Sequence, residues 1–173
     1  MAQNMNLLPL FEWLEGTAGS VGIRESILLY PVIETTHVLT LCLFLGMIAL
    51  LDLRLLGVGL RGVPVSEVAG RLLPWALAGF AVMAVSGALL FYSGPVRASA
   101  NIFFRVKMAM IGLAGINALV FHLTIHRRVA AWDRDATPPL RARMAGLFSL
   151  ILWSGVVICG RMQAYNWFDK ARG

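Results

Sequence analysis

Four long apolar stretches constrain this chain more than any other feature of its sequence. They run from about residue 27 to 51, 72 to 92, 102 to 125 and 145 to 164. Each can cross about 30 Å of hydrocarbon as a helix, which takes roughly 20 residues. Membrane strands are disfavoured because segments such as LTLCLFLGMIALL lack the polar–apolar alternation of a barrel. The sequence therefore predicts an all-α integral membrane protein with four transmembrane helices.

The composition agrees with a membrane protein and argues against other classes. Hydrophobic residues make up 58% of the 173 residues and charged residues 14%, whereas soluble domains are about 45–50% apolar and about a quarter charged. The net charge of +6 would suit nucleic-acid binding, but most basic residues flank or interrupt apolar segments, so no nucleic-acid partner is expected. Both cysteines lie within apolar stretches, which excludes a secreted disulfide scaffold.

The connections between the apolar stretches are short, which favours one domain forming an up-down, mostly antiparallel four-helix bundle. Residues 52–71 and 127–143 are expected to be polar loops, and residues 93–101 a turn-rich loop. Before the first span, apolar residues recur at helical spacing and predict an N-terminal amphipathic helix at the membrane interface, with a disordered tail as the alternative. These residues are Leu7, Leu10, Phe11 and Leu14.

The basic residues predict the orientation of the chain in the membrane. The 52–71 and 127–143 loops hold eight Lys or Arg residues, against four on the other side once those inside the predicted helices are left out. Loops rich in Lys and Arg face the cytoplasm. Both termini are therefore expected on the opposite side, which is the periplasm for a bacterial inner membrane.

Ionisable residues from three predicted helices fall in the half of the membrane nearest the termini. Ionisable groups inside a bundle cost several kcal/mol, so such a cluster indicates a functional site. Two simpler interpretations stay open: a histidine–glutamate contact that only bridges helices, and basic side chains that snorkel to lipid headgroups. The cluster comprises Glu34, His37, Arg105, Lys107 and Arg161.

Tyr30, Glu34 and His37 share one stripe of the first helix, because they are spaced by four and three residues. A histidine on a polar stripe facing basic residues fits an axial ligand of haem b, whose propionates need cations. We therefore expect His37 to bind haem iron, with Glu34 or Tyr30 beside it. The cations at the propionates would be Arg105, Lys107 and Arg161.

His122, near the opposite end of the third helix, is a second candidate metal ligand, four residues before His126. The expected depths of His37 and His122 differ by about 10–15 Å. A single haem on His37 is the favoured interpretation, and bis-histidine ligation with His122 or two haems stay open. Glu34 and His37 also match the Glu-x-x-His spacing of di-iron bundles, but such sites need a second motif and further carboxylates.

Two segments resemble a family of bacterial four-helix membrane proteins to which no activity is assigned: ESILLYPVIETTHVLTLCLFLGMIALLDLRLLG, and FFRVKMAMIGLAGINALVFH followed by RR. More distantly, the layout is similar to the haem-containing bacterial membrane protoporphyrinogen oxidase and to the copper-resistance D domain. The shared residues are His37, Gly46, Arg54, Lys107 and His122. Similarity to the oxidase implies that His37 is a haem ligand and that Lys107 contacts a propionate or substrate.

These observations together predict a haem b protein that transfers electrons, with quinone and a partner protein or periplasmic donor as redox partners. One alternative is a membrane oxidase acting on a porphyrinogen. Another is a cofactor-free accessory or assembly subunit whose polar cluster binds a lipid headgroup or a partner helix. A copper transporter is disfavoured because no Cys or Met pairs line a path. The lipid bilayer is an expected partner, and assembly as a homo-oligomer is left open.

Overall fold

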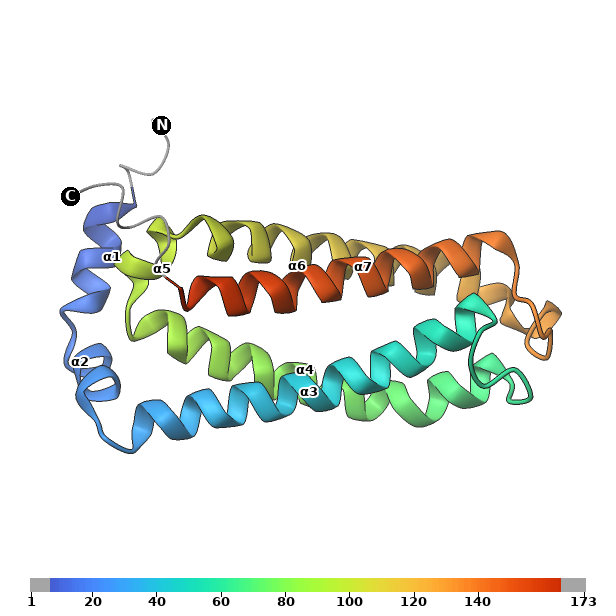
Figure 1. Cartoon of the computed structure of the whole chain (residues 1–173), viewed down its shortest axis with the longest axis horizontal. Helices are drawn as coiled ribbons and strands as arrows, with labels where there is room; N and C mark the ends of the chain where they lie inside the picture. The colour runs from blue at the N-terminus through green and yellow to red at the C-terminus, as the bar shows by residue number, and fades with distance from the viewer. Residues whose placement is uncertain (1–6, 166–173) are drawn as a thin grey trace. The chain divides into compact units, whose positions relative to one another are not determined.

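The computed structural model describes residues 7–165, apart from the side chains of Ile125 and His126. Within this range the chain is helical and contains no strand (Figure 1), which confirms the predicted all-α class. Four helices are long and apolar enough to cross a membrane, so the chain is a multi-pass membrane protein. They are α3 (Leu29–Leu56), α4 (Val65–Tyr92), α6 (Ile102–Val120, with the span continuing to Thr124) and α7 (Leu140–Gln163).

Three of the four membrane helices are longer than the apolar stretches that predicted them. α3 continues to Leu56 rather than residue 51, α4 begins at Val65 rather than 72, and α7 begins at Leu140 rather than 145. Hydropathy detects only the part of a helix suited to hydrocarbon, whereas the polar helix ends extend beyond it. The predicted 52–71 loop was therefore wrong, and the connection occupies only residues 57–64.

Three short helices complete the described fold. α1 (Leu8–Glu15) is the N-terminal helix that the sequence predicts, and its Leu10 and Trp13 side chains are exposed. α2 (Ala18–Glu25) follows it and was not predicted. α5 (Pro95–Ala100) replaces the predicted turn-rich loop, because a proline at the first helical position is already in a helical conformation.

The described chain forms two compact units, and each is treated by itself. Unit 1 comprises residues 7–44 and 77–101, and unit 2 comprises residues 45–76 and 102–165. Unit 1 therefore holds α1, α2, α5, the first part of α3 and the last part of α4. Unit 2 holds α6, α7 and the remaining parts of α3 and α4. The single-domain interpretation stays a prediction.

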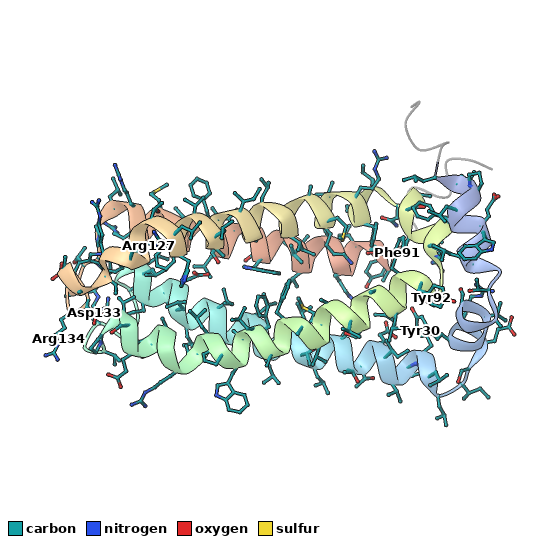
Figure 2. The ribbon with its side chains drawn as sticks, turned by 180° about the vertical axis from the view of Figure 1, so that it is seen from behind. Tyr30, Phe91, Tyr92, Arg127, Asp133 and Arg134 are labelled. Atoms are coloured by element: carbon teal, nitrogen blue, oxygen red, sulfur yellow. The ribbon has the colours of Figure 1, made fainter. Side chains whose placement is uncertain are left out.

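In unit 1, the end of α4 is tied to α1 and α2. The Tyr92 hydroxyl shares a hydrogen bond with Thr17 Oγ1, and Ser20 Oγ donates to the Tyr92 carbonyl oxygen over 2.8 Å. Phe91 meets Phe11 of α1 edge to face, with ring centroids 5.8 Å apart. Figure 2 shows Phe91 and Tyr92 at this end of α4. The amphipathic helix is thus held at the end of a membrane span, as an interfacial helix requires.

In unit 2, α6 and α7 lie side by side and run antiparallel (Figure 1). Asn117 Nδ2 donates to the Ala145 carbonyl oxygen over 2.9 Å. Lys107 Nζ donates to Gln163 Oε1 over 3.0 Å, closer to the other end of the pair. Polar side chains within these spans therefore find partners on the neighbouring helix, as polar groups in a membrane usually do.

Arg54 is the central polar residue of unit 2, and its side chain is fully buried. Its Nε donates to the Val63 carbonyl oxygen over 2.7 Å, and its Nη2 donates to the carbonyl oxygens of Asp133 and Asp135 over 3.2 and 3.1 Å. One cation thereby joins the 57–64 connection to the α6–α7 connection. Arg54, counted above as a loop residue, lies inside the end of α3, and Arg71, Arg141 and Arg143 likewise lie inside the ends of α4 and α7. The orientation of the chain stays a prediction.

Asp133 holds the start of α4 from the α6–α7 connection. Its carboxylate accepts hydrogen bonds from the Ser66 amide and hydroxyl over 2.7 and 2.6 Å, and its carbonyl oxygen accepts one from the Val65 amide over 3.0 Å. Slight desolvation raises the pKa of Asp133, but the two bonds from Ser66, aided by nearby arginines, lower that pKa below its ordinary value. Asp133 thus serves α4 as an N-cap supplied by another segment.

Replacing Arg54 tests whether this buried cation organises unit 2. We expect Arg54→Ala to lower the free energy of unfolding by about 3 kcal/mol or more, because hydrogen bonds from a charged group contribute about 1.5–3 kcal/mol each. The control is Arg71→Ala, since Arg71 is exposed and paired with Glu67 over 2.7 Å; it should cost less than about 1 kcal/mol. Far-UV circular dichroism during titration with sodium dodecyl sulfate measures both, and equal losses would contradict the assignment.

Candidate functional site

His37 lies within the membrane-spanning part of α3, roughly 12 Å along the helix axis from Leu29. Its Nδ1 is 3.0 Å from the carbonyl oxygen of Met83 on α4. A carbonyl oxygen only accepts hydrogen bonds, so Nδ1 must carry the proton. In neutral imidazole this tautomer places the lone pair on Nε2, which is the atom able to bind a metal.

Ser86, one turn further along α4, supports the same tautomer. Its Oγ lies 3.0 Å from His37 Nδ1, and its own proton goes to the carbonyl oxygen of Val82, 2.7 Å away. Toward His37 the Ser86 oxygen therefore acts as an acceptor. Two acceptors from adjacent turns of α4 thus hold the imidazole ring in one orientation.

Gly87 makes room for this ring. A Cβ atom at residue 87 would lie 3.0 Å from His37 Cε1 and 3.4 Å from Nδ1, closer than most side chains approach. Sequence reasoning found His37 but missed Met83 and Ser86 as its partners. Their role depends on the register of α3 against α4, which a hydropathy pattern does not specify.

Glu34 and Tyr30, the other predicted residues of α3, are exposed, and Figure 2 marks Tyr30 near the start of this helix. The two side chains interact electrostatically, and Arg97 of α5 adds an opposing positive charge at Tyr30. Arg97 therefore belongs to the polar surroundings of Tyr30 within unit 1. The sequence did not identify Arg97 as a site residue, because α5 lies in a segment predicted to be a loop.

The three predicted propionate cations belong to unit 2. Lys107 is half-buried and donates to Gln163, whereas Arg161 is exposed and donates from Nη2 to the Tyr165 hydroxyl over 3.1 Å. Arg105 is exposed, and residues two apart on a helix point in directions about 200° apart. Arg105 and Lys107 therefore do not share one face of α6.

His122 is exposed and lies in a π-helical turn, Phe121–Ile125, that ends the third span. Its neighbour in the sequence pattern, His126, has a side chain outside the described residues. Among the side chains that the structure describes, which exclude that of His126, no three or more of His, Cys, Asp or Glu gather where they could hold a metal ion. A haem differs from such a site because it needs only one or two axial ligands from the protein.

A shallow groove of about 410 Å³ lies between α3 and α4 of unit 1. Its lining is almost entirely apolar, and Thr36 and Ser86 are the polar residues in it. His37 is not part of the lining, so the groove lies beside the imidazole site without containing it. An apolar groove on a membrane span suits lipid acyl chains. We therefore assign no reaction to this groove.

A comparison with models of protein families shows to which family this chain belongs. A family model described as a family of unknown function, DUF6644, matches residues 10–166. The chain belongs to the DUF6644 family. The match includes all four membrane spans and His37. No curated protein and no solved structure matches the chain, so the comparisons add no link between this DUF6644 protein and the haem-containing oxidase or the copper-resistance domain.

The close approach of Gly87 to the imidazole can be tested by adding side-chain volume. We expect Gly87→Val to lower the free energy of unfolding by about 1–3 kcal/mol, because the ring must leave its place against α4. Gly112→Val on α6 is the matched control, since an added Cβ there meets no atom within 4 Å. Unfolding in detergent measures the difference, and equal stability of the two variants would show that His37 does not pack against Gly87.

Proposed function

We propose that this DUF6644 protein binds haem b through Nε2 of His37 and transfers electrons at the membrane. The observation that supports this most directly is the pair of acceptors, Met83 and Ser86, at Nδ1. Metal-binding histidines typically donate their second ring N–H to a carbonyl or another acceptor, which fixes the tautomer and orients the ring. Such an arrangement makes Nε2 a more basic and better-aimed ligand.

The residues around His37 fit an axial haem ligand. The ring is in the tautomer that a ligand needs, and Gly87 leaves it space against α4. Bound haem would supply reversible one-electron chemistry. Met83 and Ser86 hold the imidazole, while Glu34, one turn from His37, is placed to accept or release a proton beside the site.

The propionates of haem require positive charge. The sequence predicts Lys107, Arg105 and Arg161 for this role; they belong to unit 2, where Lys107 donates to Gln163, and their assignment to the propionates stays a prediction. Within unit 1, we propose Arg97 as a propionate partner, because it belongs to the same unit as His37 and Tyr30. Charge-assisted hydrogen bonds from arginine or lysine to a carboxylate are about twice as strong as neutral ones.

The proposed location is the inner membrane of a bacterium with both termini in the periplasm. Its support is the excess of basic residues in the other connections and in the helix ends beside them. His37 lies in the part of α3 nearer the N-terminus, on the periplasmic half under this orientation. Electrons would therefore pass between quinone and a partner protein or donor on the periplasmic side. His122 is proposed as a haem ligand only in the alternative in which two histidines bind the iron.

One observation favours a second candidate function. The His37 ring already bridges α3 and α4 through hydrogen bonds to Met83 and Ser86. A histidine can serve as such a bridge without any cofactor, because interhelical hydrogen bonds stabilise membrane bundles. The protein would then be an accessory or assembly subunit in which His37 is purely structural.

Visible spectroscopy separates the two candidates. Full-length protein, produced with an ample haem supply and purified in detergent, should show a b-type spectrum on reduction with dithionite, with haem quantified as the pyridine haemochrome. His37→Ala should abolish this spectrum because the axial ligand is removed. Ser86→Ala should retain haem but weaken its binding about tenfold, as loss of a group that orients a metal ligand does.

The matched control for these variants is His122→Ala. Retention of the wild-type spectrum in this variant supports a single histidine ligand, whereas its loss supports bis-histidine ligation. A colourless wild-type protein would contradict haem binding and support the cofactor-free subunit.

A further inference from the structure

A cavity of about 580 Å³ opens in unit 2 where α6 gives way to the connection with α7. It is independent of the His37 site, since its lining belongs wholly to unit 2. Three arginines line it, Arg127, Arg128 and Arg141, together with the apolar side chains of Leu123 and Trp132. Figure 2 shows Arg127 at the same end of unit 2 as Asp133 and Arg134. Positive charge and apolar surface thus line the same cavity.

The three arginines have no acidic partner in the described part of the chain. All three are exposed, and the ion pairs found there join Arg24 to Glu15 and Arg71 to Glu67. The nearby carboxylate of Asp133 is engaged by Ser66. Three guanidinium groups around one cavity repel each other unless an anion lies between them. Guanidinium groups bind phosphate with paired hydrogen bonds.

The backbone around the cavity departs from a regular α-helix. After α6 the chain forms the π-helical turn Phe121–Ile125 and then a 3₁₀ segment, His126–Ala131, with Arg128 in a non-helical conformation at φ −107° and ψ 16°. Turns of π-helix are rare in proteins, and those that occur are frequently found at functional sites. Across the cavity, α7 begins after Pro139, which provides no side-chain cap. The positive end of the α7 dipole therefore adds to the charge of the arginines.

The position of the cavity along the helices indicates which anions could reach it. Leu123 and Thr124 are the last residues of one membrane span, and Pro139 directly precedes the next span. The cavity therefore lies at the edge of the hydrocarbon layer, where phospholipid headgroups are located. Basic pockets between membrane helices bind acidic headgroups at this level. Leu123 is exposed and could contact the upper acyl chains, whereas Trp132 is buried in the core of unit 2 and forms part of the cavity wall.

We propose that this cavity binds the headgroup phosphate of an anionic phospholipid, through Arg127, Arg128 and Arg141. The test uses the full-length protein in detergent, titrated with phosphatidylglycerol or phosphatidylcholine and followed by native mass spectrometry. Wild type should bind the first phosphatidylglycerol at least tenfold more tightly than phosphatidylcholine. Because each of these guanidinium groups would donate charge-assisted hydrogen bonds to the phosphate, Arg127→Gln with Arg141→Gln should weaken phosphatidylglycerol binding by about tenfold or more.

The matched control is Arg134→Gln with Arg143→Gln, which removes the same charge from the same connection and helix start but leaves the cavity lining intact. It should change binding by less than about threefold. Arg127→Lys with Arg141→Lys keeps the charge and should lie between wild type and the glutamine variant. Circular dichroism verifies that each variant is folded, and the wild-type comparison of the two lipids needs no variant.

Three results would overturn the proposal. The first is equal binding of the two lipids by wild type, and the second is equal weakening in the cavity variant and its control. The third is displacement of phosphatidylglycerol by millimolar inorganic phosphate, which would make free phosphate the ligand of these arginines. A selective loss in the glutamine cavity variant, unaffected by inorganic phosphate, supports the lipid.

Discussion

The hydrogen bond from His37 Nδ1 to the Met83 carbonyl oxygen is the interaction on which this account depends. An imidazole in a membrane span must find a partner inside the protein, because lipid offers none. A backbone carbonyl has a second lone pair available even within a helix, so α4 can supply that partner without breaking its own bonds. The choice of a carbonyl fixes the tautomer, and the tautomer decides which ring atom is available for chemistry.

The same constraint organises unit 2 through a different side chain. Arg54 is buried at the end of α3 and directs its donors to backbone carbonyl oxygens of two connections, whereas Asp133 satisfies amides at the start of α4. Charged residues next to a membrane are thus used in two ways. Arg54 is buried and joins the two connections by hydrogen bonds. Arg127 is exposed and lines the cavity for which we propose an anionic ligand.

The sequence could predict those features that do not depend on contacts between residues far apart in the chain. Four spans and the N-terminal helix were predictable because contiguous apolar segments are sufficient to define them. The start of α4 was not, since it depends on capping by Asp133. His37 was identifiable as an ionisable residue in a span, but Met83 and Ser86 required the register of two helices. The arginine-lined cavity required a π-helical turn that no pattern indicated.

The tautomer of His37 is the most direct test of the central claim. Solid-state ¹⁵N NMR of histidine-labelled full-length protein, prepared without haem in lipid bilayers, resolves protonated from unprotonated ring nitrogens. The chain has three histidines, so the His37 signals are identified by their loss in His37→Ala. We predict that Nδ1 of His37 carries a proton and that Nε2 does not. A proton on Nε2 with none on Nδ1 would contradict the anchoring by Met83 and, with it, the assignment of His37 as a metal ligand.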